Sequence, residues 1–166
     1  LPSRKLGPGD VRWRRDHLKP MQLWVVDTIE FNTRQVGGYL MGLYAYDVKA
    51  GAERFFPMKA KTDVYDCLLR LTAMEGLHKR PYPVTVMSDN CGSMVHAERA
   101  CLTHGLSYFP IPPNDPRMSM AESNVGDFKE RSACMFYAAA TEDGPLTSKH
   151  LVETVKYCCY LRDRHS

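Results

Sequence analysis

Short apolar runs and amphipathic stretches follow one another along this chain in an order that predicts its layers. Three apolar runs come first, separated by short turns, and each has the length of a strand. They cover residues 22–31, 39–48 and 53–59. Apolar residues at helical spacing then follow over residues 62–77, with Thr62 as the expected N-cap, so the meander of strands leads into a helix.

The second half of the chain predicts two more strands and three more helices. We expect strands at residues 84–88 and 106–109, and helices at 93–104, 119–139 and 147–162. A meander of three strands followed by alternating helices and strands is typical of an α/β fold with a mixed five-stranded sheet flanked by helices. It is the order of elements in the ribonuclease H-like fold.

Length and charge favour one domain that follows a basic arm. The chain has 166 residues, 44% of them apolar and 25% charged, which suits a single globular core. Residues 1–20 carry six basic against two acidic side chains, whereas residues 21–166, the expected core domain, are close to neutral. A basic arm suits phosphate backbones, although a solvated linker explains it equally well. No apolar run approaches the roughly 20 residues that span a bilayer, so we expect no membrane partner.

The six cysteines show no C-x-x-C spacing, which argues against a structural zinc site. Several of them fall on the apolar faces of the expected helices, as buried free thiols do. Free thiols favour a reducing intracellular compartment.

Three acidic residues stand at positions that point to a specific role for the carboxylate. Asp27 interrupts the first apolar strand, Asp89 ends the fourth, and Glu122 opens the helix after the proline-rich loop at 110–116. A carboxylate in an apolar strand is tolerated when it is paired or binds a cation. In a ribonuclease H-like fold the middle of the first strand lies beside the end of the fourth, and the helix after the fifth crosses near them. The order of elements therefore predicts that the three carboxylates converge.

Motifs around these acids, in the same order and at similar spacing over most of the chain, point to one family. Residues 88–92, Ser-Asp-Asn-Cys-Gly, are similar to Ser-Asp-Asn-Gly-Gly around a second acid. Asn114 precedes Glu122 by eight residues, like the Asn of a flexible active-site loop. Together with residues 54–61 and 160–164, these motifs resemble the catalytic core of a retroviral-type integrase, most closely that of copia-type retrotransposons.

The resemblance implies a polynucleotidyl transferase that trims DNA 3′ ends and joins them to target DNA. Two Mg²⁺ or Mn²⁺ ions would serve the attacking and leaving oxygens. By this resemblance Asp27 would bind both ions, Asp89 one and Glu122 the other. Asn114 and Lys129 would contact DNA. The resemblance also implies a homo-oligomer that binds element ends and target DNA, in the nucleus or in an intracellular virus-like particle.

The helix that carries Glu122 departs from the family's pattern. Ser123 stands where the family usually has Arg, and Val125 and Gly126 replace other polar or basic positions. Two alternatives therefore stay open. One is an integrase-derived domain that has lost catalysis and binds DNA or protein. The other is a ribonuclease H-like endonuclease that acts on RNA–DNA hybrids.

Two further expectations concern motion and assembly. Residues 111–120, flanked by prolines, are predicted to be the most mobile internal segment. The first and last helices carry more apolar and aromatic side chains than one core face needs, which favours a dimer through them, as in integrase cores. These side chains are Tyr65, Leu69, Tyr157 and Tyr160.

Overall fold

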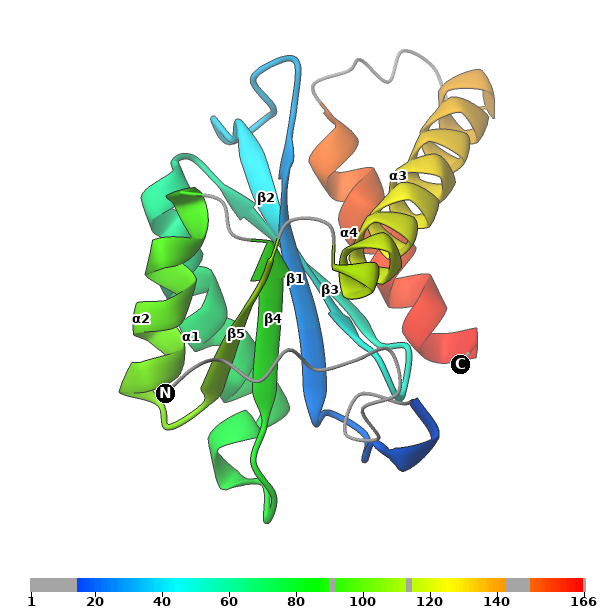
Figure 1. The fold of residues 1–166 in the computed structure, drawn as a ribbon. Coiled ribbons are helices and arrows are strands. Elements are labelled where there is room, and N and C mark those ends of the chain that lie inside the picture. Colours follow the sequence, from blue (N-terminus) through cyan, green and yellow to red (C-terminus); the bar gives the residue numbers. More distant parts are fainter. Residues whose placement is uncertain (1–14, 90–91, 113–114, 143–149, 166) are drawn as a thin grey trace.

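A mixed sheet with the strand order β3-β2-β1-β4-β5 lies between two layers of helices (Figure 1). The computed structural model describes residues 15–89, 92–112, 115–142 and 150–165. The strands are β1 (Leu23–Glu30), β2 (Met41–Asp47), β3 (Glu53–Met58), β4 (Thr85–Asp89) and β5 (Ser107–Ile111). β1, β2 and β3 pair antiparallel, whereas β4 pairs parallel with both β1 and β5. The predicted α/β architecture with a mixed five-stranded sheet is confirmed, and it is compatible with a ribonuclease H-like fold.

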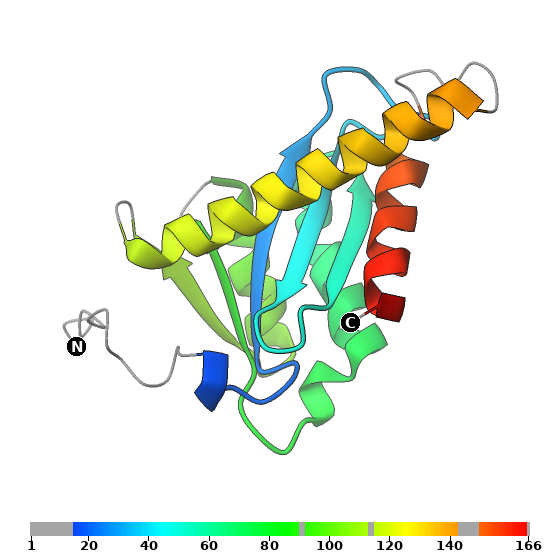
Figure 2. The ribbon, with the colours of Figure 1, turned by 90° about the vertical axis from the view of Figure 1, so that its right-hand side faces the viewer.

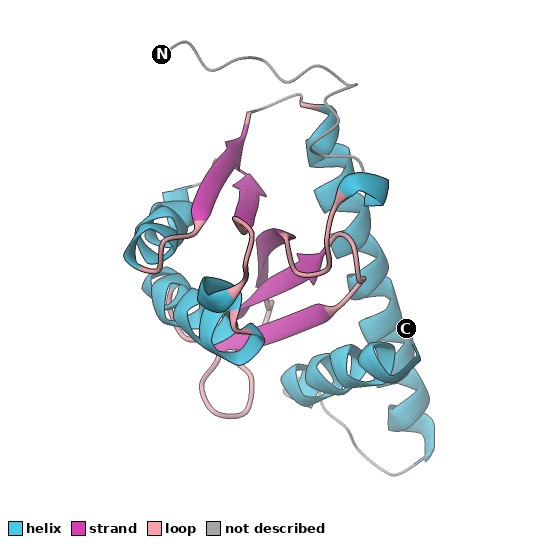
Figure 3. Cartoon of the chain, turned by 90° about the horizontal axis from the view of Figure 1, so that it is seen from below, coloured by secondary structure: helices cyan, strands magenta, loops and turns pink. Residues whose placement is uncertain are grey.

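The helices divide into two pairs, one on each face of the sheet (Figures 1 and 3). The α-helices of the described residues are α1 (Val64–Glu75), α2 (Val95–Thr103), α3 (Pro116–Glu142) and α4 (Leu151–His165). Short 3₁₀ turns are η2 (Arg15–His17), η3 (Lys61–Asp63), η4 (Leu77–Lys79) and η5 (Gly92–Met94). Figure 2 shows α3 crossing the strands obliquely, with α4 beside the edge strand β3. Within the described residues, no helix has the length and apolar character to span a membrane.

Alternation along β1 sends its side chains into two separate cores. Trp24 and Val26 pack in the core that includes α1 and α2. Val25 and Ile29 pack in the other core, with residues of α3 and α4. Because side chains two residues apart share one face of a strand, Asp27 points to the side covered by α3.

Aromatic packing holds α3 against the sheet. Phe128 of α3 is 1% exposed, and its ring stacks on that of Tyr44 in β2 with 4.3 Å between centroids. Burying a side chain of this size contributes about 1.5–3 kcal/mol. One turn earlier, Val125 is also buried in this core. The face of α3 that carries these two residues is therefore fixed toward β1 and β2.

Helix α3 begins earlier than the sequence predicts. The expected start was residue 119, but the helix runs from Pro116, a residue whose fixed φ suits the first helical position. β5 likewise continues to Ile111, which is fully buried. Both ends of the segment 111–120 therefore belong to regular elements, residues 113–114 lie outside the described residues, and the mobility of the segment stays a prediction. Glu122 consequently lies in the second turn of the helix and does not open it.

The first helix also begins differently from the prediction. Thr62 was the expected N-cap, but residues 61–63 form a 3₁₀ turn and α1 starts at Val64. The Asp63 carboxylate accepts hydrogen bonds from the backbone N–H groups of Lys59 and Ala60, at 2.8 and 3.1 Å. An acceptor four residues later along the chain therefore shapes this turn.

The cysteines of the described residues are free thiols, and most are buried, as predicted. Cys67, Cys101, Cys158 and Cys159 are buried, whereas Cys134 is exposed. Burial raises the pKa of Cys67 and of Cys101 to about 12, so these thiols stay protonated and unreactive near neutral pH.

Candidate functional site

Two carboxylates lie at one level on neighbouring strands, Asp27 in β1 and Asp89 at the end of β4. The parallel register sets Val25 opposite Met87, and each aspartate stands two residues further along its own strand. Val25 and Met87 both belong to the core under α3, so the same face carries both aspartates. The chain separates these residues widely, and the β1–β4 pairing brings them side by side.

Glu122 approaches the same region from above the sheet. It precedes the buried Val125 by three residues on α3, which is close to one helical turn, and its own side chain is exposed. The negative charges of Asp89 and of Glu122 both act on Asp27 and raise its pKa. Asp27 therefore lies within electrostatic reach of both other acids.

The environment of Asp27 disfavours its charge. Desolvation by burial is the main cause that raises its pKa from 3.8 to about 6, and the two nearby acids add to it. The backbone N–H of Thr28 donates to Asp27 Oδ1 at 2.7 Å and opposes the shift, as does the positive charge of Lys129. A divalent cation at this place would reverse the balance, because it favours the ionised carboxylate.

One carboxylate oxygen of Asp89, Oδ1, is buried. Among the described residues none donates a hydrogen bond to it, and the same holds for Glu53 Oε2. Buried polar atoms are nearly always satisfied, and an unsatisfied carboxylate oxygen is costly. The end of β4 is held in place nonetheless, since Ser88 Oγ donates to the Asp89 carbonyl at 2.9 Å and hydrogen-bonds the Tyr108 hydroxyl at 2.6 Å. These bonds fix the backbone that carries the Asp89 carboxylate.

The three acids fit a hard divalent cation in the type of their donors. Carboxylate oxygens are the ligands that Mg²⁺ and Mn²⁺ prefer. In the described part of the chain, however, no group of three or more His, Cys, Asp or Glu side chains is close enough to hold a metal ion. Like charges repel, and a bound cation is what draws such carboxylates together. Glu122 has the exposed side chain and is the one free to move toward the two aspartates.

Of the two predicted DNA contacts, one can be placed. Lys129 lies seven residues after Glu122 on α3, is exposed, and lowers the pKa of Asp27 through its charge. It therefore stands beside the acids, where a phosphate of a bound strand would meet it. Asn114 lies outside the described residues.

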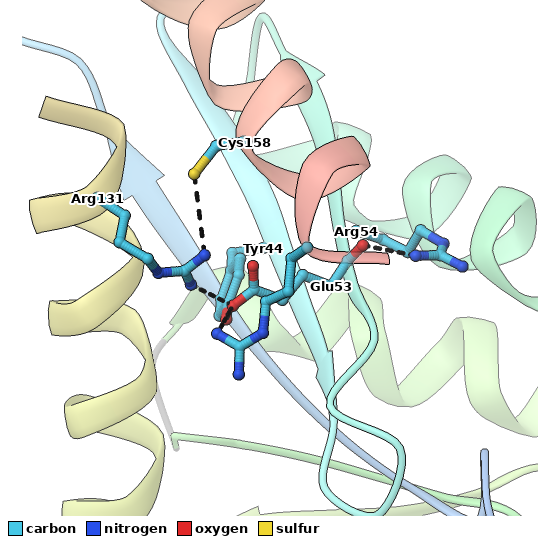
Figure 4. Close-up of polar contacts among 6 residues, drawn as sticks. Tyr44, Glu53, Arg54, Arg131 and Cys158 are labelled. Atoms are coloured by element: carbon cyan, nitrogen blue, oxygen red, sulfur yellow. Dashed lines mark hydrogen bonds and ion pairs between the residues drawn. The ribbon is translucent and has the colours of Figure 1, made fainter. Parts of the chain in front are cut away.

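A second buried acid, which the sequence did not single out, anchors both α3 and α4 (Figure 4). Glu53 of β3 is 1% exposed. Its Oε1 accepts hydrogen bonds from the Tyr44 hydroxyl at 2.8 Å, Arg131 Nη2 at 2.6 Å and Arg162 Nη1 at 2.9 Å. Arg131 comes from α3 and Arg162 from α4, so one carboxylate ties both helices to the sheet. The signal that could have found it, an acid in an apolar strand, is the one that marked Asp27.

A further ion pair connects the two helical layers at the edge of the sheet. Arg54 of β3 donates through Nε to Glu75 of α1 at 2.6 Å, and through Nη1 to Asp163 of α4. Two of the three groups are at most 20% exposed, so this contact is shielded from solvent better than an ordinary surface pair. It fixes the end of α4. Together with Glu53 and its donors Tyr44, Arg131 and Arg162 (the Glu53 cluster), it fixes the position of the helix pair above the acids.

The four side chains predicted to form a dimer surface differ in exposure. Tyr157 and Tyr160 of α4 are 53% and 49% exposed, and their rings stack on one another. Tyr65 and Leu69 of α1 are partly buried and pack against the core under α1 and α2. The dimer through both helices stays a prediction.

Comparison with known proteins assigns this chain to no family. No protein-family model matches the sequence, and no curated protein matches it. What the protein does is therefore inferred from its own residues and their placement.

Proposed function

We propose that this protein is a metal-dependent polynucleotidyl transferase with a ribonuclease H-like core, which cuts and joins DNA strands as retroviral-type integrases do. The observation that supports the proposal best is the β1–β4 register, because it sets Asp27 and Asp89 at one level beneath the helix of Glu122. The motif at residues 88–92 and the order of elements add support. The proposal carries with it a nuclear or virus-like-particle location and a homo-oligomeric active form.

Asp27, Asp89 and Glu122 would together bind two Mg²⁺ or Mn²⁺ ions. Such a pair of ions, when bound, activates the attacking oxygen and stabilises the leaving oxygen of a phosphodiester. Asp27, which feels the charges of both other acids, is the residue suited to contact both ions. Asp89 would contribute its unpartnered Oδ1, and Glu122 would close the site from α3.

Protonation of Asp27 would compete with the ions. With a pKa of about 6, this carboxyl is substantially protonated in weakly acidic solution. Ligand oxygens must be deprotonated to bind metal, so ion binding releases a proton and strengthens as the pH rises through 6. Activity limited by this step is expected to rise over the same interval.

Lys129 would position the nucleic acid. Its exposed ammonium lies beside the acids, where it can contact a phosphate oxygen without binding an ion. The Glu53 cluster fixes α3, and with it the height of Lys129 and Glu122 over the strands.

A strand-transfer assay with labelled DNA ends and a target duplex, in Mg²⁺ and in Mn²⁺, tests the proposal. Asp89→Asn is expected to lower the rate more than about 100-fold, since even outer partners of metal ligands cost 10–100-fold. Asp127→Asn is the matched control, because it makes the same change at an exposed acid of α3. Strand transfer by Asp89→Asn at the wild-type rate would reject Asp89 as a ligand.

A second candidate is a domain that binds DNA or protein without catalysis. The observation in its favour is that, over the residues that the structure describes, no three acids are close enough to hold an ion. The same assay separates the candidates, because DNA binding without strand transfer in either metal supports the inactive domain. Cleavage confined to an RNA–DNA hybrid would instead support a ribonuclease H-like endonuclease.

A further inference from the structure

A groove leads away from the acids along α3, and Lys129 stands at its start. Two adjoining pockets of about 290 and 300 Å³ compose it. Phe31, Asn32, Ala133 and Leu151 line both pockets, so the two form one continuous depression between α3, the start of α4 and the chain after β1. Its place next to the acidic cluster makes it a candidate path for a bound strand.

Ser132 of this groove has a buried hydroxyl that could hydrogen-bond a ligand. It is 3% exposed, it lines the first pocket, and its Oγ has no hydrogen-bond partner among the described residues. Buried hydroxyls are almost always paired, and an unpaired one weakens the fold. A ligand that hydrogen-bonds Ser132 from within the pocket accounts for a hydroxyl at this position.

The rest of the pocket suits a flat, aromatic ligand with polar edges. Phe31, Phe55 and Phe128 form its apolar lining, with the Phe31 and Phe55 rings edge to face at 6.1 Å. Asn32 adds an amide that both donates and accepts hydrogen bonds. Enzymes that take a single base out of the stack hold it in this way, between aromatic side chains and hydrogen-bonding groups at its edge.

Lys129 connects the groove to the acids. Its charge reaches Asp27, and its side chain also lines the first pocket. A strand with one phosphodiester at the acids can therefore place a neighbouring phosphate on Lys129 and the attached base in the pocket. A base has to leave its stack in the duplex to enter a pocket lined by side chains, so the nucleotide that enters is unpaired.

We propose that this groove binds one unpaired nucleotide of the DNA strand held at the acidic cluster, with its base against Phe31 and its edge on Ser132. The choice of DNA as the ligand rests on the proposed function. The protein is then expected to prefer DNA with an unpaired nucleotide next to the reacting phosphodiester over the same sequence fully paired. Base–aromatic stacking corresponds to an affinity ratio of about 5- to 140-fold.

Equilibrium binding of two DNA probes to the 166-residue chain tests this proposal. One probe is a duplex that ends in two unpaired nucleotides, the first of them 2-aminopurine, and the other is its fully paired counterpart. Fluorescence anisotropy gives the two affinities, and 2-aminopurine emission reports whether the unpaired base changes its surroundings. Ca²⁺ replaces Mg²⁺ and Mn²⁺ throughout, so that the acids can bind a divalent ion while strand cutting is suppressed.

Two variants of the groove are expected to reduce the preference toward unity. Ser132→Ala removes the hydroxyl and, because that hydroxyl has no hydrogen-bond partner among the described residues, keeps or raises the thermal stability. Ala133→Leu fills the groove where the two pockets join. Tyr157→Ala is the control, since it removes an exposed aromatic ring from α4 outside both pockets and should keep the wild-type preference.

Equal affinity of the wild type for both probes overturns the proposal, as does an undiminished preference in both groove variants. Strand transfer by Asp89→Asn separates this result from the proposed function. If Asp89→Asn retains full activity while the groove variants lose the preference, the two-metal assignment fails and the groove assignment stands. If Asp89→Asn is inactive and the groove variants bind as the wild type does, only the groove assignment fails.

Discussion

Glu53 on β3 and Asp27 on β1 are both carboxylates in apolar strands of one sheet, on the face covered by α3 and α4. Glu53 receives three hydrogen bonds on one oxygen, from Tyr44, Arg131 and Arg162 (Figure 4). Asp27 receives one from the backbone of the next residue, and its charged neighbours include two further acids. Two arginines neutralise the first carboxylate, whereas the charged groups near the second are two acids and Lys129, so its ionised form is disfavoured.

The difference between the two acids comes from residues that are far away in the sequence. Arg131 stands 78 positions after Glu53, and Arg162 stands 109 positions after it. An acid that meets cations from distant elements serves the fold, because a buried charge is stable only when paired. An acid that meets other acids destabilises the fold, and acids of this kind cluster at functional sites. The same local pattern in the sequence therefore supports opposite roles.

The largest effect is expected from breaking the structural acid. Glu53→Ala leaves two arginines facing each other without their shared carboxylate, and we expect a loss of about 3 kcal/mol in the free energy of unfolding. Urea unfolding followed by circular dichroism measures it. Glu130→Ala, an exposed acid next to Arg131, serves as the control and should change stability by less than about 0.5 kcal/mol. A loss as small as that of the control would mean that Glu53 does not anchor the helices.

Substitution of Asp27 is expected to have the opposite effect on stability, an increase above pH 6. The pKa of Asp27 is about 6 when folded against 3.8 as the reference, so its contribution to stability is full below pH 3.8 and is lost as the pH rises through 6. Asp27→Asn removes this dependence. Above pH 6 the free energy of unfolding of the variant should exceed that of the wild type by about 2 kcal/mol. This is less than the full pKa shift of Asp27 corresponds to, because the side chain is partly exposed. Unfolding of both proteins in the absence of divalent ions, at pH 4 and pH 7.5, checks the sign, and a wild type more stable than the variant at pH 7.5 contradicts it.

A smaller effect is expected from removing one hydrogen-bond donor of the Glu53 cluster. Tyr44→Phe removes one of the three donors to Glu53 and keeps the ring that stacks on Phe128. We expect a loss of about 1.5 kcal/mol, since hydrogen bonds to charged groups contribute more than neutral ones. Tyr46→Phe makes the same change on the same strand at a tyrosine that is not among the described donors to Glu53, and should be close to neutral. Equal effects of the two substitutions would show that the bond to Glu53 adds little.

Local patterns were enough to predict most of the fold. Apolar runs and helical spacing gave the five strands and four helices in the right order, because a half-buried strand or helix is marked in its own residues. The errors lie at the ends of the helices. Pro116 was assigned to a loop although it starts α3, and Thr62 was assigned as a cap although Asp63 shapes that turn. Both depend on backbone geometry that the residue type alone does not fix.

The candidate site was predictable in part, for the same reason. Asp27 and Asp89 are conspicuous in their strands, and the order of strands sets them on one face. The role of Glu53 was missed because it depends on two arginines from distant helices. The unpaired hydroxyl of Ser132 was also missed, since a serine within a helix gives no sign of what its side chain faces.

Divalent-ion binding tests the central claim, that Asp27, Asp89 and Glu122 form a cation site, most directly. Thermal unfolding of the wild type, Asp89→Asn and Asp127→Asn is compared with and without Mn²⁺, at pH 7.5 and at pH 5. The account predicts that Mn²⁺ at a hundredfold excess over its Kd stabilises the wild type and Asp127→Asn by about 2.7 kcal/mol at pH 7.5. It predicts a much smaller effect at pH 5, where Asp27 is protonated, and none in Asp89→Asn. A wild type that Mn²⁺ does not stabilise at pH 7.5, or an Asp89→Asn variant that responds as the wild type does, would contradict the claim.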